Sequence, residues 1–370
     1  NMHANTQIPK VIGYQRIAEL AHDMQYHNAS EYFWEIVTRQ RSLALGGNSR
    51  REHFPTKETC IDYVNDIDGP ETCNTYNMLK LTEDLNRVNH QGMYGDFYET
   101  AIFNHILSAQ HPEHGGYVYF TSARPRHYRN YSAPNKAMWC CVGTGMEDHG
   151  KYGQFIWTHD KGMKTEDDAL YVNLFVASEL NWKERKMVLR QQTAFPYAET
   201  SNIEVTKGKG VFTLKIRKPL WCDNFTVKGV GFVVDCYEEN GFVCIKRKWK
   251  KGDQVEISMP MHASIKPMIN VPQYVAIMYG PILLGMKSGT EDMRSLIADD
   301  SRFGQYAAGM KLPLDKAPIL LPKHLNDIAK DLKPIPDKPL HFKLATHMEN
   351  VINGELQPFF EIHDSRYMMY

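Results

Sequence analysis

The first part of the chain, up to roughly residue 160, carries apolar residues at the spacing of helices. Side chains three or four residues apart share one face of a helix, so this spacing predicts amphipathic helices that bury one side. Loops rich in Gly, Asn and Pro separate the apolar runs. The runs are Ile17, Leu20, Ala21 and Met24; Phe33, Ile36 and Val37, which follow a candidate N-cap at Ser30; Met78, Leu81, Leu85 and Val88; and a face that begins with Phe97, Ala101, Ile102 and His105.

From Ala169 onward the period of the pattern changes to two. Successive side chains of a strand point to opposite faces, so this alternation predicts β-strands. Several such runs follow at short intervals with turn sequences between them, which is typical of a β-sandwich. The runs are Leu170, Val172, Leu174 and Val176; Phe212, Leu214 and Ile216; Phe242 and Cys244; Val255, Ile257 and Met259; and Val275 and Ile277, with turns at 207–210, 239–241 and 251–253.

Beyond Gly285 the periodicity fades into Pro- and Lys-rich sequence, for example at 332–339. These changes predict a helical domain at 1–162, a β-sandwich domain at 163–290, and a C-terminal part at 291–370 that is a partial β domain or an extended segment. The chain also starts and stops within patterned sequence, without capping residues. We therefore expect it to be a piece of a longer protein.

The composition excludes some classes of partner. With 370 residues the chain is long enough for two or three domains, each with a core of its own. Lys and Arg together number 43, as do Asp and Glu, so no net field favours nucleic acid or an anionic membrane as a partner. No apolar run approaches the roughly 20 residues that cross a bilayer, and the first residues lack the pattern of a signal peptide.

Cysteine usage raises the main question about chemistry. Seven cysteines, an odd number in a long chain, indicate reduced thiols rather than a disulfide framework. Cys140 and Cys141 are adjacent, and adjacent cysteines rarely bond to each other because the ring they close is strained. Together with Glu71 and Cys73 they offer three thiols and a carboxylate for a zinc ion. The spacing is not that of a zinc finger or ribbon, so buried core cysteines remain the favoured interpretation on spacing alone.

The tripeptide Glu-Thr-Cys occurs twice, at 58–60 and at 71–73. The second copy follows a turn at 66–70 and leads directly into helical sequence at 77–82, which places it at a helix N-terminus. Helix N-termini stabilise anions such as thiolate and carboxylate. The first copy lacks a clear helical continuation, so we assign Cys73 to the candidate site and Cys60 to the core.

Two further polar residues are candidates for the functional site, and each also has an ordinary structural interpretation. Glu52 lies in a polar loop at 46–54 that begins with two glycines. It is either a general acid or a solvated carboxylate paired with Arg50 or Arg51, and the sequence alone favours the second interpretation. Tyr119 follows a short aromatic alternation and either lines a polar pocket or is a half-buried strand tyrosine.

Five motifs, in this order, resemble the bacterial β-L-arabinofuranosidases of glycoside hydrolase families 127 and 146, with the wording of the second and third closer to family 146. They are HANTQIPKVIG, GGNSRREHF, NDIDGPETCNTYNMLKLTEDL, GGYVYFTSARP and MWCCVGTGMEDHGKY. RQQTAFPY, LKIRKPLWC and VAIMYGPILLG continue the resemblance to about residue 290. The resemblance implies an α+β multidomain fold, with an (α/α)6 toroid followed by β-sandwich domains.

The resemblance also implies which residues carry the chemistry. Zn²⁺ would be the cofactor. Cys140 matches the nucleophile and Glu52 the acid/base, and His3 and Tyr119 match positions that contact the sugar. The implied zinc ligands are Glu71, Cys73, Cys140 and Cys141.

These assignments can be rebuilt from physical requirements. A retaining glycosidase needs a nucleophile on one face of the anomeric carbon and an acid/base at the leaving oxygen. A thiol bound to Zn²⁺ is deprotonated, so Cys140 can attack and form a thioglycosyl intermediate. Glu52 would protonate the leaving oxygen and then activate water. The expected substrate is an arabinose-containing oligosaccharide or plant glycan that releases L-arabinofuranose.

The match to the toroid is incomplete. Residues 1–162 have room for about half of its helices, given a typical helix length of roughly 11 residues. We therefore expect the C-terminal half of the toroid, without the N-terminal half and its sugar-binding histidines. On this expectation the chain alone folds poorly or has weak activity, because half a toroid leaves helix faces unburied.

Two other functions fit the same residues. One is a non-catalytic carbohydrate-binding remnant in which a structural zinc site staples the helices. The other is a conventional hydrolase that uses two carboxylates, again with structural zinc. The glycan, its linkage, the oligomeric state and the bacterial compartment, cytoplasm or periplasm, are left open by the sequence.

Overall fold

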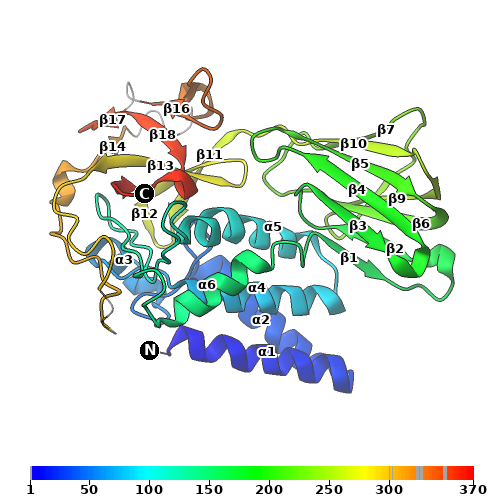
Figure 1. Cartoon of the computed structure of the whole chain (residues 1–370), viewed down its shortest axis with the longest axis horizontal. Coiled ribbons are helices and arrows are strands. Elements are labelled where there is room, and N and C mark those ends of the chain that lie inside the picture. The colour runs from blue at the N-terminus through cyan, green and yellow to red at the C-terminus, as the bar shows by residue number, and fades with distance from the viewer. Residues whose placement is uncertain (1, 300, 302, 322–324, 326–327, 345–347) are drawn as a thin grey trace. The chain divides into compact units, whose positions relative to one another are not determined.

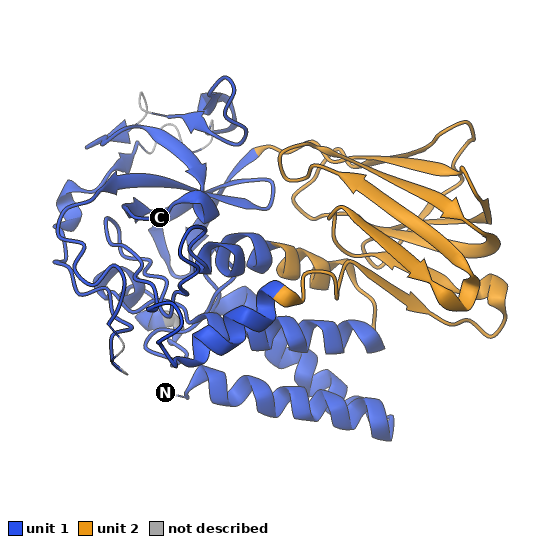
Figure 2. Cartoon of the chain, viewed as in Figure 1, with its two compact units in different colours: residues 1–88, 100–149, 263–370 blue, residues 89–99, 150–262 orange. Residues whose placement is uncertain are grey.

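The computed structural model describes residues 2–299, 301, 303–321, 325, 328–344 and 348–370. The chain divides into two compact units, shown in different colours in Figure 2. Unit 1 comprises 1–88, 100–149 and 263–370, and unit 2 comprises 89–99 and 150–262. No helix in the described part of the chain is long and apolar enough to cross a bilayer.

Helices form the first part of unit 1 (Figure 1). Helix α1 packs against both α2 and α4. The indole Nε1 of Trp34 in α2 donates a hydrogen bond of 2.8 Å to the Thr82 hydroxyl in α4. The α-helices that begin in unit 1 before residue 150 are α1 (Ala4–Ala21), α2 (Met24–Gln40), α3 (Asp62–Asn65), α4 (Thr72–Val88) and α6 (Cys140–Gly150), whereas α5 (Gly92–Ala101) begins in the 89–99 stretch of unit 2.

The first predicted apolar face is wrong in detail. Helix α1 buries Ile8, Val11 and Ala18, whereas Leu20 is 69% exposed and Ile17 is 43% exposed. The predicted run also spans the break between α1 and α2, because His22 adopts a left-handed conformation that ends α1. The apolar spacing therefore identified residues on the exposed face of α1 rather than on its buried face.

The predicted cap at Ser30 is also wrong. Helix α2 begins earlier, after Asp23, whose carboxylate accepts a hydrogen bond of 2.9 Å from the Gln25 amide. Ser30 lies inside the helix, where its hydroxyl donates to the Tyr26 carbonyl at 2.8 Å. A hydroxyl that bonds back to the preceding turn is compatible with a helix interior, so a serine does not by itself mark a helix start.

Unit 1 ends in a sheet built from the C-terminal part of the chain. Strands β12 and β13 form a hairpin, and β18 and β19 both pair with β13. The strands of this sheet are β11 (Ala263–Met268), β12 (Val271–Tyr279), β13 (Ile282–Gly289), β15 (Lys333–Pro334), β16 (Phe342–Lys343), β18 (Glu355–Pro358) and β19 (Arg366–Met368), and β14 (Ile319–Leu320) pairs with β17 (Met348–Glu349) elsewhere.

This sheet shares one apolar core with the helical part of unit 1. Leu45, Tyr63 and Val64 pack in the same buried cluster as Leu283 and Phe359. The Tyr370 hydroxyl accepts a hydrogen bond of 2.6 Å from the Ala44 amide, although the two residues are far apart in the sequence. The C-terminal residues therefore complete the core around the loops that follow α2.

Unit 2 is a sandwich of two five-stranded sheets. The predicted strand at 212–216 is confirmed within β6, where Phe212, Leu214 and Ile216 are buried. The strand predicted at 170–176 ends sooner, at Val172. One sheet has the order β1 (Trp157–Asp160), β2 (Ala169–Val172), β6 (Lys209–Arg217), β9 (Phe242–Lys250) and β8 (Tyr237–Glu239), and the other has β3 (Ser178–Trp182), β4 (Met187–Thr193), β5 (Thr200–Lys207), β10 (Gln254–Ser258) and β7 (Thr226–Gly229).

The predicted fold class, α+β with helices followed by a β-sandwich, is confirmed. The change from a helical period to a period of two at Ala169 coincides with the first residue of β2. The pattern locates this change because it depends on local backbone geometry alone.

Candidate metal centre

One group of side chains in unit 1 has the composition and spacing of a metal site. Each of Glu71, Cys73, Cys140 and Cys141 offers a ligand atom, and these atoms lie within 4.8 Å of one another. The Sγ atoms of Cys73 and Cys141 are 3.3 Å apart, and those of Cys140 and Cys141 are 4.0 Å apart. Glu71 Oε1 lies 3.4 Å from Cys140 Sγ. Two thiolates bound at ~2.3 Å to a tetrahedral ion stand roughly 3.8 Å apart, so these separations fit one metal ion.

The four ligands come from two helix starts. Glu71 immediately precedes α4, which begins at Thr72 and contains Cys73, and α6 begins at Cys140. A short bridge between Glu71 and Phe120 ties the start of α4 to the 117–120 segment. Because the N-terminus of a helix favours negative charge, both helices favour anionic ligands at this point.

The two Glu-Thr-Cys copies have different surroundings. Cys73 joins the cluster, whereas Cys60 is buried in the apolar core with Tyr63 and Val64. The Cys60 thiol contacts the carbonyl of Thr56 at 3.5 Å. The sequence argument from the helix start thus selects the copy that the fold brings to the other cysteines.

The four acidic groups of the cluster need a cation if all of them are to be ionised. Hydrogen bonds from Cys141 and Cys73 lower the pKa of Cys140 to about 2. Burial raises the pKa of Glu71 and of Cys141 well above their ordinary values. Four neighbouring acids without a cation cannot all ionise, so the charge gathers on one of them and the others keep their protons. Glu71 Oε2 is moreover buried without a hydrogen-bond partner. The donor set therefore fits a metal ion, whose charge would allow all four to ionise.

Glu52 lies beside this cluster, linked to it by Tyr119. The Tyr119 hydroxyl donates a hydrogen bond to Glu52 Oε1 and lies 3.7 Å from Cys140 Sγ. His3 Nε2 lies 3.5 Å from the other carboxylate oxygen of Glu52, Oε2. The fold thus brings His3, Glu52 and Tyr119 to one place together with the four candidate ligands.

The loop that carries Glu52 has an unusual backbone. Arg51 and Glu52 have φ values of 46° and 65°, in the left-handed region that costs energy for residues other than glycine. Such a conformation persists only where the surroundings hold it. The start of α1 supplies part of this hold, because the amide of Ala4, the first residue of that helix, donates to the Glu52 carbonyl at 2.7 Å.

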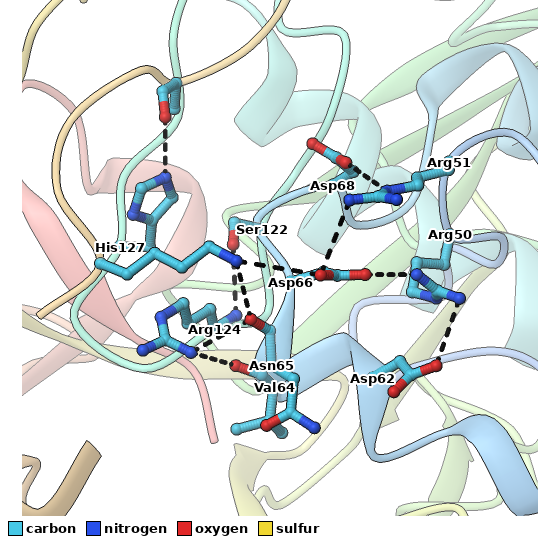
Figure 3. A network of polar contacts seen from close by, with 12 residues as sticks. Arg50, Arg51, Asp62, Val64, Asn65, Asp66, Asp68, Ser122, Arg124 and His127 are labelled. Atoms are coloured by element: carbon cyan, nitrogen blue, oxygen red, sulfur yellow. Dashed lines mark hydrogen bonds and ion pairs between the residues drawn. The ribbon is translucent and has the colours of Figure 1, made fainter. Parts of the chain in front are cut away.

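A set of ion pairs holds the same loop (Figure 3). Arg51 Nε lies 2.8 Å from Asp68 Oδ2. Arg50 pairs with Asp66 and, at 3.2 Å, with Asp62. The two arginines therefore pair with the 62–68 segment, which corrects the expectation that one of them pairs with Glu52.

Sequence reasoning missed this ion-pair set. The available signal was the run of three acidic residues at Asp62, Asp66 and Asp68 shortly after the Arg50–Arg51 pair. Charge runs usually lie on solvated surfaces, so the pattern alone does not single out a clamp. Asp68 is nevertheless buried. Burial raises its pKa overall, although the hydrogen bond from Arg51 offsets part of this rise.

Three family models match the chain. The GH127 catalytic domain of β-L-arabinofuranosidase matches residues 1–154, and the GH127 middle domain of β-L-arabinofuranosidase matches residues 169–261. A domain of unknown function matches residues 264–370. A search of curated proteins found no match.

Solved structures share the fold over 99% of this chain. The GH127 β-arabinofuranosidase BT3674 has a TM-score of 0.73 at 19% identity, with 59% of its chain covered. Ara127N-Se, a GH127 β-L-arabinofuranosidase from Geobacillus stearothermophilus T6, has a TM-score of 0.70 at 20% identity, with 60% covered. A glycoside hydrolase has a TM-score of 0.70 at 18% identity, with 65% covered. The chain thus spans less than two thirds of the length of these structures.

Proposed function

We propose that this chain, which belongs to the glycoside hydrolase family 127 of β-L-arabinofuranosidases, releases L-arabinofuranose from β-L-arabinofuranosides. The two family matches together cover well over half of the chain. The observation that carries the proposal is the Glu71, Cys73, Cys140 and Cys141 cluster, which lies next to Glu52. The cluster supplies the nucleophile and Glu52 the acid/base, so both groups that double displacement at an anomeric carbon requires lie at one place.

We propose Zn²⁺ as the metal. Three thiolates and one carboxylate at tetrahedral separations are a donor set that Zn²⁺ prefers over Mg²⁺ or Ca²⁺, which take oxygen ligands. When bound, Zn²⁺ keeps its cysteine ligands deprotonated at neutral pH. Glu71 Oε1, which lies 3.4 Å from Cys140 Sγ and 3.9 Å from Cys141 Sγ, would complete the set.

Cys140 is the proposed nucleophile because a sugar can reach it. Cys73 and Cys141 are buried, whereas Cys140 is exposed. In the first step the Cys140 sulfur would bond to the anomeric carbon while the glycosidic C–O bond breaks. Glu52 would donate its proton to the leaving oxygen in the same step.

The second step returns the enzyme to its starting state. The ionised Glu52 would take a proton from water, and the water oxygen would attack the anomeric carbon as the C–S bond breaks. Two displacements at one carbon retain its configuration. Tyr119, whose hydroxyl contacts both Glu52 and Cys140, is positioned to orient both groups, and His3 is positioned to contact the sugar beside Glu52.

A matched pair of variants tests the metal site. Both Cys60 and Cys73 follow Glu-Thr, and both are buried thiols. Cys73→Ser is expected to lower the zinc bound per chain, measured by atomic absorption after dialysis, while Cys60→Ser keeps it. Equal zinc content in the two variants would rule out Cys73 as a ligand.

A second experiment tests the chemistry. We expect the chain, and a version extended at its N-terminus, to hydrolyse an aryl β-L-arabinofuranoside, and Cys140→Ser to abolish turnover. A trapped sugar should appear by mass spectrometry on the peptide that contains Cys140. An adduct on a glutamate instead would indicate a conventional two-carboxylate hydrolase, and sugar binding without turnover would indicate a carbohydrate-binding protein.

A further inference from the structure

The described residues of the 294–312 segment, which falls within the match to the domain of unknown function, contact residues 124–131 of the catalytic match. Hydrogen bonds from both backbone and side-chain groups join the two stretches. They run from Tyr131 N to Leu296 O and from Ala298 N to Tyr131 O, both 2.8 Å; from Asn130 Nδ2 to Gly304 O, 2.7 Å; from His127 Nε2 to Ala307 O, 3.1 Å; from Gly309 N to the Tyr128 hydroxyl, 2.6 Å; and from Arg124 Nη2 to Leu312 O, 3.0 Å.

The segment reaches the candidate metal centre at two points. Ala298 is buried in the same apolar cluster as Cys73 and Cys141. Tyr306 packs on Phe120, with ring centroids 5.5 Å apart and planes at 34°. The Phe120 ring in turn lies 4.6 Å from that of Tyr119. A row of three aromatic rings therefore leads from the Cys140 and Glu52 contacts of Tyr119 to Tyr306.

Tyr306 is held in place yet open to a ligand. Its chain neighbours are anchored on both sides, at Gly304 and at Ala307, so its backbone has little freedom. The residue is nevertheless 39% exposed. A large side chain that is held and partly uncovered loses little conformational entropy when a ligand packs against it.

The charges that act on the Tyr306 hydroxyl include those of the Glu52 loop. Burial raises the pKa of Tyr306, the charges of Asp68 and Glu52 raise it further, and Arg51 lowers it. Arg51 and Asp68 form the ion pair that holds the loop (Figure 3). Because Glu52 is the proposed donor to the leaving oxygen, the Glu52 side of the site is the side of the leaving group.

We propose that Tyr306 contacts the sugar that leaves, so that the domain of unknown function supplies a specificity-determining residue to the catalytic site. The C–H face of a sugar is apolar and packs on an aromatic ring, while the phenol can bond to a sugar hydroxyl. This proposal rests on the function proposed above. It places the Tyr306 side chain on the leaving-group side of the site.

The test compares the affinities of two sugars for a chain that is made inactive by a single substitution. Glu52→Gln is used so that bound sugar is not hydrolysed. L-Arabinose occupies only the position beside Cys140, whereas a disaccharide with a non-reducing β-L-arabinofuranosyl residue also occupies the leaving-group position. Calorimetry gives the affinity of the Glu52→Gln chain for both, with and without Tyr306→Ala, Tyr306→Leu or Tyr306→Phe.

We expect Tyr306→Ala and Tyr306→Leu to weaken the disaccharide about tenfold more than L-arabinose, because a lost stacking contact affects only the ligand that makes it. Tyr306→Phe keeps the ring and should retain most of the affinity. Tyr32→Ala, which alters an exposed tyrosine of α2, is the matched control.

Equal weakening of both sugars, or no weakening of either, would overturn the role of Tyr306. If the Glu52→Gln parent itself binds neither sugar, the proposed function fails, and this inference fails with it. Melting temperature and zinc content of each variant show whether the fold is kept. If Tyr306→Ala does not fold, the comparison of Tyr306→Leu with Tyr306→Phe decides by the same criterion.

Discussion

At the scale of single residues, the adjacent cysteines occupy unlike environments. Cys141 is fully buried, and Cys140 is exposed. Both stand in the first turn of α6, where successive side chains diverge by about 100° around the helix axis. One residue can therefore face the interior of the site while its neighbour faces the substrate, which agrees with a ligand at Cys141 and a nucleophile at Cys140.

Tyr119→Phe removes a hydroxyl that contacts Glu52 and Cys140, and it should lower activity without affecting metal binding. The hydroxyl donates to Glu52 and lies 3.7 Å from Cys140 Sγ, but Tyr119 is not a candidate ligand. A hydrogen bond to a charged group, here the Cys140 thiolate or the ionised Glu52 of the second step, contributes ~1.5–3 kcal/mol, so we expect kcat/KM to fall about 10- to 100-fold. Zinc content should stay at the level of the parent. An unchanged kcat/KM would show that this hydroxyl does not act in the reaction.

Gly69→Ala should disturb the cluster without changing any ligand. A Cβ at Gly69 would clash with the backbone carbonyl oxygen of Thr121. The Thr121 amide also donates to the Pro70 carbonyl at 3.0 Å, so the turn before Glu71 has no room to shift. We expect lower zinc content and a lower melting temperature. Gly153→Ala is the control, because a Cβ there meets nothing within 4 Å, and equal effects of the two changes would contradict the argument.

At the scale of elements, the β6 strand of unit 2 ends in a buried charge. The Arg217 side chain is fully buried, and its guanidinium lies 2.6 Å from a carboxylate oxygen of both Asp96 and Glu99. Arg217 Nε also donates to the Asn173 carbonyl at 2.6 Å. Every partner lies in unit 2, so this one side chain ties the strand to the 89–99 segment.

Arg217→Met should be strongly destabilising. It would leave two buried carboxylates without a cation, and breaking a buried pair by removing one partner typically costs ~3–5 kcal/mol. Arg190→Met is the matched control, since Arg190 pairs with Glu179 at 3.0 Å on the surface, where a pair contributes ~0–1 kcal/mol. Urea unfolding gives both values. A loss as small as that of Arg190→Met would mean that Asp96 and Glu99 are neutral in the fold.

At the scale of the whole molecule, unit 1 depends on three separate stretches of sequence. The described residues of the 264–370 match close the core around the loops after α2, and those between 294 and 312 contact residues 124–131. Helix α1 still exposes Tyr14, Ile17 and Leu20. The expectation that the chain alone folds poorly or has weak activity stays a prediction.

Buried histidines should make unit 1 sensitive to acid. Burial lowers the pKa of His105 to about 3 and that of His127 to about 4. A histidine that is neutral in the fold but titrates at its usual value in the unfolded chain favours unfolding as pH falls below that value. Its contribution to stability is complete above pH ~6.5 and is lost as pH falls toward the folded pKa, at ~1.4 kcal/mol per pH unit for each such histidine.

Urea unfolding between pH 4 and 6 measures this slope. His105→Gln should lower the slope by ~1.4 kcal/mol per pH unit, because one titrating group is removed. His262→Gln, at an exposed position outside unit 1, is the control. The same slope in His105→Gln as in the parent would mean that His105 is protonated in the fold.

The sequence by itself determined the type and order of the elements. The change of period at Ala169 and the apolar run in β6 follow from local geometry, which each stretch carries in its own spacing. The choice of Cys73 over Cys60 was also local, because a helix start can be recognised from a few neighbouring residues. That Glu71, Cys73, Cys140 and Cys141 form one site was implied by the family resemblance, because the spacing of the cysteines alone favoured buried core residues.

Only the tertiary structure decided which faces and charges meet. Helix α1 buries Ile8 and Val11 rather than Ile17 and Leu20, because a partner helix selects a buried face and apolar spacing does not. The pairing of Arg51 with Asp68 and the packing of Tyr306 on Phe120 are likewise contacts between segments distant in sequence. Such contacts depend on how elements pack in space, and no local pattern in either partner encodes them.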